Sequence, residues 1–538
     1  MLSPMHRRDW LRRVVTAGAA GVVPGSEIAP ALGIGLGDHA AWLREALPIS
    51  PSEPRRLRAY DLRVKAAFAA ASAAVPARAS TTDESDIPAH LAMFSKGLPH
   101  DHFGIVDPQA YRALARAASG AADVRFEDVP LGGRRRLVSP QAAFAYALEG
   151  LDAAMLAAPA PPSFGSAAFA QDAIDAWWLA LTRDVPFALH AVDPLVTRAA
   201  QDLTRAGRAT SASAWAAAPS AAAAGPVVSQ FLLRAVPMGA QVLSPRVLAQ
   251  ESGESFLTTW EEWLASQNGQ LPLREVTTAA RRYICCGRDL ATWTRTDYPG
   301  QAGLQAALQL EALRAPVTPD HPYVRSRNQA GYVTFGLPFI VDLSQRVAMH
   351  ALRAAWFHKW VMHRRLRPEE LGGRLEAAAA GAPVAAWPDA RFLQSDACGE
   401  VRRRTGSLLL PQAWPEGAPL HPAYPAAHAA TAGAMVTVLK AYYATDWVLP
   451  DPVEPTPDGR ELMAIDASLT VGGELDKLAW NVAMGRAWAG VQWRADAEAG
   501  LRLGESVAIG LLRELRELLP EPDARFAVRT FDGSIVEA

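Results

Sequence analysis

Helical patterns recur along most of this chain, whereas the alternating patterns typical of β-strands are scarce. Alanine, the residue with the highest helix propensity, is abundant throughout, and few Val/Ile/Thr runs alternate with a period of two. Half of the 538 residues are hydrophobic, which is enough for a sizeable core in one large or two ordinary domains. The sequence therefore predicts a large all-α fold built from helix bundles.

Individual elements can be placed from local signals. Ser344 is a suitable N-cap, Pro425 is well placed just before a first helical turn, and Asp532-Gly533 predicts the turn of a minor terminal β-hairpin. The helices expected in the C-terminal half span about 301–314, 344–366, 425–443, 476–494 and 495–518.

The N-terminal residues have the features of an export signal. Arg7-Arg8 precedes an aromatic residue, a leucine and a mildly apolar stretch, and Ala29-Pro-Ala31 offers a small-x-small cleavage site. If residues 1–33 form a twin-arginine signal, the mature protein is exported folded to the periplasm or the extracellular space. A basic, disordered leader is the alternative. The remainder divides into an N-terminal helical half, 34–270, and a C-terminal helical half, 271–538, which carries the candidate chemistry.

Charge and cysteine content exclude several classes of function. A net charge of −2 gives no pull toward nucleic acid or anionic membrane, and no stretch predicts a convincing transmembrane helix, so no integral membrane association is expected. The three cysteines, Cys285, Cys286 and Cys398, are expected to be buried thiols, with a disulfide between Cys398 and one of the pair as the alternative. No zinc, haem or dinucleotide motif is present.

Two cationic side chains lie on either side of a predicted helix end. Lys359 is near the end of that helix, and Arg367 precedes Pro368, which moves the backbone of residue 367 away from helical geometry. The break lets both side chains reach one point, where they suit an oxyanion such as phosphate or vanadate. A solvated basic helix end is the alternative, because three more basic residues occupy 363–365.

Two further segments add candidate groups. His428 falls in the first turn of a predicted helix, where backbone N–H groups and the helix dipole favour an anion. An imidazole there can donate a proton to that anion. Arg486 lies on another helix, with Gln492 six residues further on. Taken singly, His428 could be a capping or core histidine, and Arg486 an ordinary helix arginine.

The three segments, in this order and with these spacings, resemble the oxyanion site of vanadium-dependent haloperoxidases and their relatives, the type 2 phosphatidic acid phosphatases. The seven residues between Lys359 and Arg367, and the five between Arg486 and Gln492, match the algal bromoperoxidase type of that family. The resemblance covers most of the chain after residue 90 and implies a large helical assembly of the haloperoxidase type. Similar segments outside the site lie at 94–101, 182–187, 259–265 and 530–534.

The resemblance also assigns roles to residues. His428 would act as acid–base, and His421, at a second histidine position seen near the site in bromoperoxidases, would be a second catalytic residue. Bound vanadate would polarise hydrogen peroxide as a Lewis acid, and a halide would attack it to release hypohalous acid. Family members of this type are usually oligomers, so a homo-oligomer is expected. The residues that would hold the oxyanion are Lys359, Arg367, Ala426, Ala427 and Arg486.

Three positions depart from the family pattern. Gln492 stands where the family has the histidine that bonds to vanadium, and an amide oxygen is a weaker vanadium ligand than a neutral imidazole. An amide is also no usable phosphorus nucleophile, so phosphatase turnover through a phosphohistidine is not expected. Ala426 and Ala427 replace what is typically Ser-Gly, which removes a hydroxyl donor and adds a methyl group where glycine permits close approach.

Three functions are compatible with this sequence, and an enzyme that acts on a small molecule is favoured. The first is a divergent haloperoxidase that oxidises halide with hydrogen peroxide and retains vanadate, a doubtful cofactor here, despite Gln492. The second is a vanadium-free enzyme that reuses the oxyanion pocket for an acid–base rearrangement or cyclisation, or for a substrate that carries phosphate or diphosphate. The third is a non-catalytic, exported anion-binding pseudoenzyme.

Overall fold

The structure, a computed structural model, describes residues 54–72, 83–220, 222–521 and 524–538. The predicted export signal at 1–33 lies outside the described residues. Contacts divide the chain into two compact units, Met1–Val75 and Pro76–Ala538. Helix α4 (Pro54–Ser72) belongs to the first unit, and the elements described below belong to the second.

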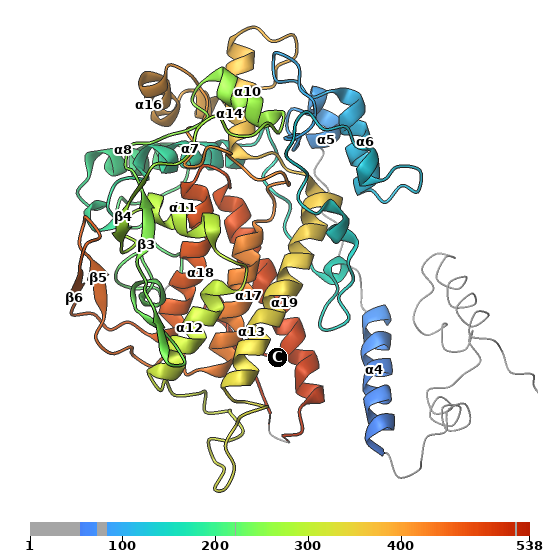
Figure 1. Ribbon diagram of the computed structural model, residues 1–538, viewed down its shortest axis with the longest axis vertical. Helices are drawn as coiled ribbons and strands as arrows, with labels where there is room; N and C mark the ends of the chain where they lie inside the picture. Colours follow the sequence, from blue (N-terminus) through green and yellow to red (C-terminus); the bar gives the residue numbers. More distant parts are fainter. Residues whose placement is uncertain (1–53, 73–82, 221, 522–523) are drawn as a thin grey trace, which may run out of the picture. The chain divides into compact units, whose positions relative to one another are not determined.

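The second unit is built mainly from α-helices, as predicted (Figure 1). Its longer helices are α6 (Pro108–Ala118), α7 (Ala167–Thr182), α8 (Pro194–Arg205), α11 (Gly287–Thr296), α12 (Gln301–Ala312), α13 (Leu337–Phe357), α14 (Pro368–Ala379), α16 (Asp396–Thr405), α17 (Ala427–Tyr442), α18 (Val471–Trp488) and α19 (Arg494–Leu518). Its shorter helices are α5 (Asp83–Asp86), α9 (Gln230–Leu233), α10 (Trp260–Gln267) and α15 (Ala390–Leu393).

Strands are short and paired only in twos within the described residues. The four antiparallel pairs include the predicted terminal hairpin, in which Ala527 pairs with Glu537 and Arg529 with Ile535. No larger sheet takes part in the core of the described chain. The pairs are β1 (Val236–Met238) with β2 (Gln241–Leu243), β3 (Val247–Gln250) with β4 (Thr278–Arg282), β5 (Val453–Pro455) with β6 (Leu462–Ala464), and β7 (Ala527–Arg529) with β8 (Ile535–Glu537).

Helix α17 is the centre of the main bundle and packs against α13, α18 and α19 (Figure 1). Every residue of α17 except His428 is buried. Its contact with α19 is unusually close, because a Cβ atom placed on Gly504 would lie 2.1 Å from the Ala430 carbonyl oxygen, and one on Gly500 would lie 2.4 Å from that of Ala426. Glycine on α19 therefore brings the bundle up against the first turns of α17, where the candidate site begins.

Replacing Gly504 with alanine should destabilise the fold by about 2–3 kcal/mol, since the added methyl group would meet backbone atoms that cannot move aside. The urea or thermal unfolding midpoint measures the effect. Gly399 on α16 is a matched control, because a Cβ atom there meets nothing within 4 Å. Gly399→Ala should be neutral or stabilise slightly, and an equal loss in both variants would contradict the close-packing interpretation.

Two predicted helix starts were wrong, and the same two helices end earlier than predicted, α13 at Phe357 and α18 at Trp488. Helix α13 starts at Leu337, and the Ser344 hydroxyl donates to the Val341 carbonyl oxygen (2.9 Å) inside the helix instead of capping it. Helix α18 starts at Val471, since the Thr470 side chain accepts from the Gly473 N–H and caps it. In both cases the helix begins several residues before the predicted start, directly after its N-cap residue.

All three cysteines are buried free thiols, so the alternative of a Cys398 disulfide is excluded. Among the described helices, none is both long enough and apolar enough to cross a membrane.

Candidate oxyanion site

The segment that carries Lys359 and Arg367 is shaped by an irregular helix end. Helix α13 runs into η6 (His358–His363), a π-helical turn of the kind often found at functional sites, which ends at Arg364 in the left-handed conformation (φ 43°). Arg367 is extended (φ −86°, ψ 157°), as predicted from Pro368, and caps α14, which has Pro368 in its first turn. Both Lys359 and Arg367 are fully buried, so the alternative of a solvated basic helix end is wrong.

Lys359 and Arg367 both donate hydrogen bonds to the loop that leads into α17. The Lys359 ammonium group donates to the carbonyl oxygens of Pro422 (2.8 Å) and Ala423 (2.6 Å). The Arg367 guanidinium group donates to the carbonyl oxygens of His421 (2.9 Å) and Pro422 (3.1 Å). Residues 359 and 367 therefore meet at the 421–423 backbone, which brings two segments separated in sequence to one place.

Gln492 is held by hydrogen bonds on both sides of its amide. Its Oε1 accepts from Arg367 (2.7 Å), and its Nε2 donates to the Ala423 carbonyl oxygen (2.6 Å) and to the Asp496 carboxylate (2.5 Å). The orientation of the amide is fixed by chemistry, because Arg367 can only donate and the other two groups can only accept. The amide oxygen is thus engaged by a cation within the protein.

Arg486 is the least constrained of the three cations. It lies in the last turn of α18, donates to the Thr294 carbonyl oxygen (3.0 Å) and stacks over Trp414 at 4.9 Å. Arg486 lowers the pKa values of Lys359, His421 and His428, which places its charge beside all of them. Because Arg486 makes a single hydrogen bond to the described residues, most of its donors are available to a ligand.

His428 is paired with a carboxylate that sequence reasoning missed. Its Nε2 lies 3.0 Å from Oδ1 of Asp297, the residue that follows α11. Burial, and then the charge of Arg486, lower the pKa of His428, while Asp297 opposes the shift. His428 is therefore neutral near pH 7, and because a carboxylate only accepts, Nε2 carries the proton and Nδ1 is left as the basic atom. Only the fold could reveal this pair, since Asp297 is 131 residues away in sequence.

His421 has a different environment. Its ring packs at a tilted angle against Trp356, with 4.8 Å between the ring centroids, and its Nδ1 lies 2.9 Å from Arg367. Burial and the charges of Arg367, Lys359 and Arg486 hold the pKa of His421 well below its usual value. An imidazole that accepts from Arg367 and does not ionise near pH 7 is suited to positioning that arginine and not to proton transfer.

The site holds more buried positive charge than the protein neutralises. Among the described residues, Lys359, Arg367 and Arg486 have no carboxylate ion-pair partner, whereas the nearby Arg365 pairs with Asp496 (2.5 Å) and Asp172 (3.2 Å). Burial and then the charges of Arg367 and Arg486 lower the pKa of Lys359 well below its usual value, and burial and Arg486 lower that of Arg367 to about 9. Burial lowers the pKa of Arg486 to about 10, against the opposing charges of Asp297 and Glu416. Buried charge without a counter-charge is costly, so this cluster is suited to a bound anion.

The N-terminus of α17 adds N–H donors to the cluster. Ala426 caps the helix, and its own N–H donates to the Asp496 carbonyl oxygen (2.9 Å), so it is not available to a ligand. The N–H groups of the first turn, which begins with Ala427 and His428, have no acceptor within the helix. They favour an anion, although the Ala426 side chain offers no hydroxyl group to bind it.

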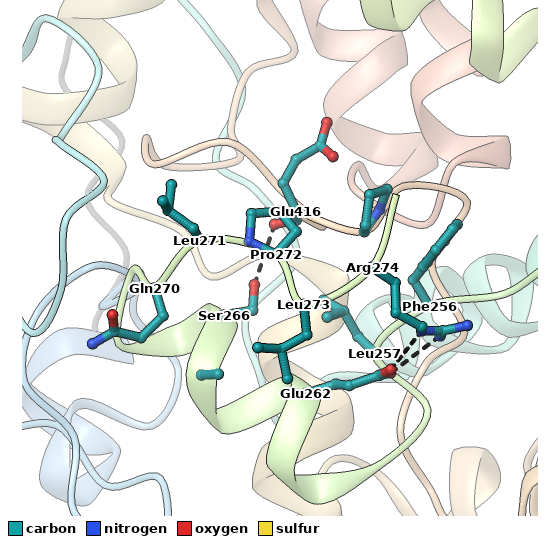
Figure 2. A pocket seen from close by; sticks show the side chains of 12 residues that line it. Phe256, Leu257, Glu262, Ser266, Gln270, Leu271, Pro272, Leu273, Arg274 and Glu416 are labelled. Atoms are coloured by element: carbon teal, nitrogen blue, oxygen red, sulfur yellow. Dashed lines mark hydrogen bonds and ion pairs between the residues drawn. The ribbon is translucent and has the colours of Figure 1, made fainter. Parts of the chain in front are cut away.

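These residues fit a tetrahedral oxyanion bound by charge and hydrogen bonds. They do not supply the nitrogen ligand of a coordinated vanadate, because the amide at 492 has no basic nitrogen and its oxygen already accepts from Arg367. A pocket beside α10, lined by residues from that helix, the following loop and Glu416, contains none of the predicted site residues (Figure 2).

Comparisons with known proteins identify the family of this chain. Residues 340–520, which contain every predicted site residue, match the family model described as the VCPO second helical-bundle domain. The chain is 33% identical to a vanadium-dependent bromoperoxidase of Ascophyllum nodosum, over 83% of this chain and 86% of the relative. It is 28% identical to that of Corallina officinalis, over 91% of this chain and the whole of the relative.

A solved structure supports the fold independently. The homohexameric second vanadate-dependent bromoperoxidase from Ascophyllum nodosum superimposes with a TM-score of 0.84 at 27% identity and covers 91% of both chains. The same helical architecture, the sequence identity over most of the chain and the match across the site segments lead to one conclusion: this chain belongs to the vanadium haloperoxidase superfamily.

Proposed function

We propose that this protein binds a tetrahedral oxyanion in the buried cluster and, when that oxyanion is vanadate, oxidises halide ions with hydrogen peroxide. The observation that carries the proposal is the absence, among the described residues, of a carboxylate partner for Lys359, Arg367 and Arg486. An oxyanion would supply the missing negative charge and accept hydrogen bonds from Arg486 and from the first turn of α17. Membership of a superfamily whose relatives are vanadium-dependent bromoperoxidases points to vanadate and halide.

The residues that hold the anion and those that move protons are distinct. Vanadate, when bound, supplies Lewis acidity that activates peroxide. Lys359, Arg367 and Arg486 neutralise its charge, and Gln492 contributes by orienting Arg367. His428 would accept a proton from hydrogen peroxide at Nδ1 and donate it to the peroxide oxygen that leaves as water, with Asp297 stabilising the imidazolium ion in between.

Replacing Arg486 with glutamine should weaken oxyanion binding by about 10–100-fold, because a charge-assisted hydrogen bond contributes about 1.5–3 kcal/mol. The fold should be retained, since Arg486 makes one hydrogen bond, to Thr294. Calorimetric titration with vanadate and with phosphate measures the affinity, and bromide oxidation with peroxide measures turnover.

Two controls accompany this measurement. Arg486→Lys keeps the charge and should retain part of the affinity. Arg403→Gln, which replaces an exposed arginine that pairs with Glu400, should leave the affinity unchanged. An affinity that is unchanged in Arg486→Gln would show that the oxyanion binds elsewhere.

Oxyanion affinity should fall as the pH rises. The pKa of Lys359 in the free protein is well below its usual value because of burial, Arg367 and Arg486, and a bound anion raises it by favouring the charged form. Oxyanion affinity is therefore highest below the pKa of Lys359 in the free protein. Above that pKa it falls by up to about tenfold per pH unit, and it levels off above the pKa of Lys359 in the complex.

Sulfate is a suitable probe for the pH dependence because it does not titrate in this range. Its affinity and the accompanying proton uptake can be followed by calorimetry from about pH 6 to pH 8, below the pKa of about 9 of Arg367. Lys359→Met should abolish the slope. A slope that persists in this variant would assign the titration to another group.

A second function is favoured by the hydrogen bonds of Gln492. Because its amide occupies an Arg367 donor and no nitrogen ligand is present, the pocket is also suited to a phosphate, diphosphate or enolate-like oxyanion without vanadium. His428 and Asp297 would then serve acid–base chemistry such as a rearrangement or cyclisation. Diphosphate binding without peroxide turnover would favour this function, and binding without any turnover would indicate a non-catalytic anion-binding protein.

We further propose a homo-oligomer, as in the homohexameric relative, and export by the N-terminal signal. Light scattering of the purified chain measures its assembled mass.

A further inference from the structure

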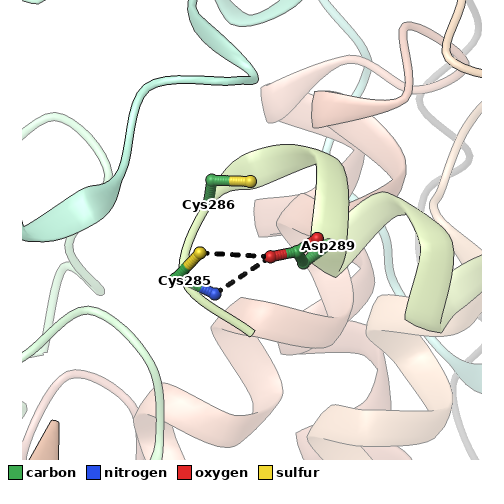
Figure 3. A group of neighbouring side chains, drawn as sticks. All are labelled: Cys285, Cys286 and Asp289. Atoms are coloured by element: carbon green, nitrogen blue, oxygen red, sulfur yellow. Dashed lines mark hydrogen bonds between the residues drawn. The ribbon is translucent and has the colours of Figure 1, made fainter. Parts of the chain in front are cut away.

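A cluster of two thiols and a carboxylate lies at the start of α11, away from the residues assigned to the oxyanion site. The ligand atoms of Cys285, Cys286 and Asp289 all lie within 4.8 Å of one another, and all three residues are buried (Figure 3). We propose that these residues form a binding site for one thiophilic divalent ion, with Zn²⁺ as the physiological candidate and Cd²⁺ as a probe, and that His190 supplies the fourth ligand.

The spacing of the cluster suits such an ion. The Cys285 sulfur lies 3.4 Å from Oδ2 of Asp289, close to the separation of about 3.5 Å that follows from Zn–S and Zn–O bonds of ordinary length at a tetrahedral angle. Cys286 contributes a second sulfur from the adjacent residue. Two thiolates with one carboxylate are a donor set that favours thiophilic metals over Ca²⁺ or Mg²⁺.

The charges also balance. Arg282 donates to both oxygens of Asp289 at 2.9–3.1 Å, so without an ion the carboxylate and the guanidinium group cancel while the thiols remain neutral. When a divalent ion binds, both thiols release their protons to solvent, and the two negative charges of the thiolates equal the two positive charges of the ion. Binding therefore leaves the net charge of this buried region unchanged, which avoids the cost of an unpaired buried ion.

A cavity provides access, and it is also lined by His190, which lies outside the 4.8 Å cluster. Cys285 and His190 line the same cavity of about 160 Å³. His190 is 2% exposed, and neither of its ring nitrogens has a hydrogen-bond partner of good geometry among the described residues. A buried imidazole without a partner is unusual and is suited to coordinating a metal.

The site would anchor the helix that completes the oxyanion site. Cys286 caps the N-terminus of α11, and Asp297, which holds His428, follows its C-terminus. Thr294 near the same end accepts from Arg486. An ion at the start of α11 would fix the position of this helix and, through it, both Asp297 and the Thr294 carbonyl group.

The test uses the full chain, treated with a chelator and kept reduced by a phosphine. Zn²⁺ should bind with one ion per chain in competition with a chromophoric chelator, and about two protons should be released per ion. Cd²⁺ should give the ultraviolet absorption of thiolate-to-cadmium charge transfer. Failure to bind one Zn²⁺ per chain, or Cd²⁺ binding without this absorption, would overturn the proposal.

Variants identify the ligands. Cys285→Ser and Cys286→Ser should each weaken Zn²⁺ binding by at least about 100-fold, and His190→Ala by at least about 10-fold. Cys398→Ser is the matched control, because it removes the third buried thiol, on α16, and should leave the affinity unchanged. If Cys285→Ser binds Zn²⁺ as tightly as the native chain, the proposed site is overturned. If His190→Ala does so, His190 is not a ligand. The Cd²⁺ absorption of the native chain decides the matter even where a variant does not fold.

Discussion

Gln492→His should raise vanadate affinity and vanadate-dependent bromide oxidation by at least about 100-fold. The substitution introduces the imidazole nitrogen that the site lacks and removes the amide oxygen that occupies a donor of Arg367. Asp496 lies 2.5 Å from Nε2 of Gln492, where it can accept a hydrogen bond from an imidazole, as carboxylates do for metal-bound histidines. Calorimetric titration with vanadate and the initial rate of bromide oxidation measure the two effects.

Gln492→Leu separates the two causes. Leucine also frees the Arg367 donor but brings no ligand nitrogen. If Gln492→Leu gains as much as Gln492→His, release of Arg367 is the cause and coordination is not. If Gln492→His binds vanadate no better than the native chain, the interpretation of residue 492 as a missing ligand is contradicted.

His428→Ala should lower kcat by about 10²–10⁴-fold, the usual contribution of a positioned acid–base group. The vanadate affinity of His428→Ala should stay within about tenfold of that of the parent protein, because the charge of the anion is offset mainly by Lys359, Arg367 and Arg486. The measurement is best made in the Gln492→His background, where turnover is expected to be highest.

Two companion variants show whether the effect is chemical. Asp297→Asn removes the carboxylate 3.0 Å from His428 Nε2. It should also lower kcat, and it should shift the pH profile of kcat. His102→Ala removes an exposed histidine far from any assigned role and should leave kcat unchanged. A fall in affinity equal to the fall in kcat would instead make His428 a binding residue.

The helical class and the positions of the site segments follow from sequence. Period-3.6 patterns placed α12, α17 and α19 closely, because these helices are long and their signals are local. The break before Arg367 was predictable from Pro368, which acts on its immediate neighbour. The starts of α13 and α18 could not be predicted in the same way, because their N-caps, Gly336 and Thr470, lie before the stretches with the strongest helical patterns.

What the sequence by itself determined is the set of charged groups available: Lys359, Arg367, Arg486 and His428, with an amide at 492. Only the tertiary structure decided how they are used. Burial without carboxylate partners turns three ordinary cations into an anion site, and Asp297 and Arg367 define the roles of His428 and Gln492. The reason is physical: local signals act over a few residues, whereas desolvation and ion pairing depend on which distant segments pack together.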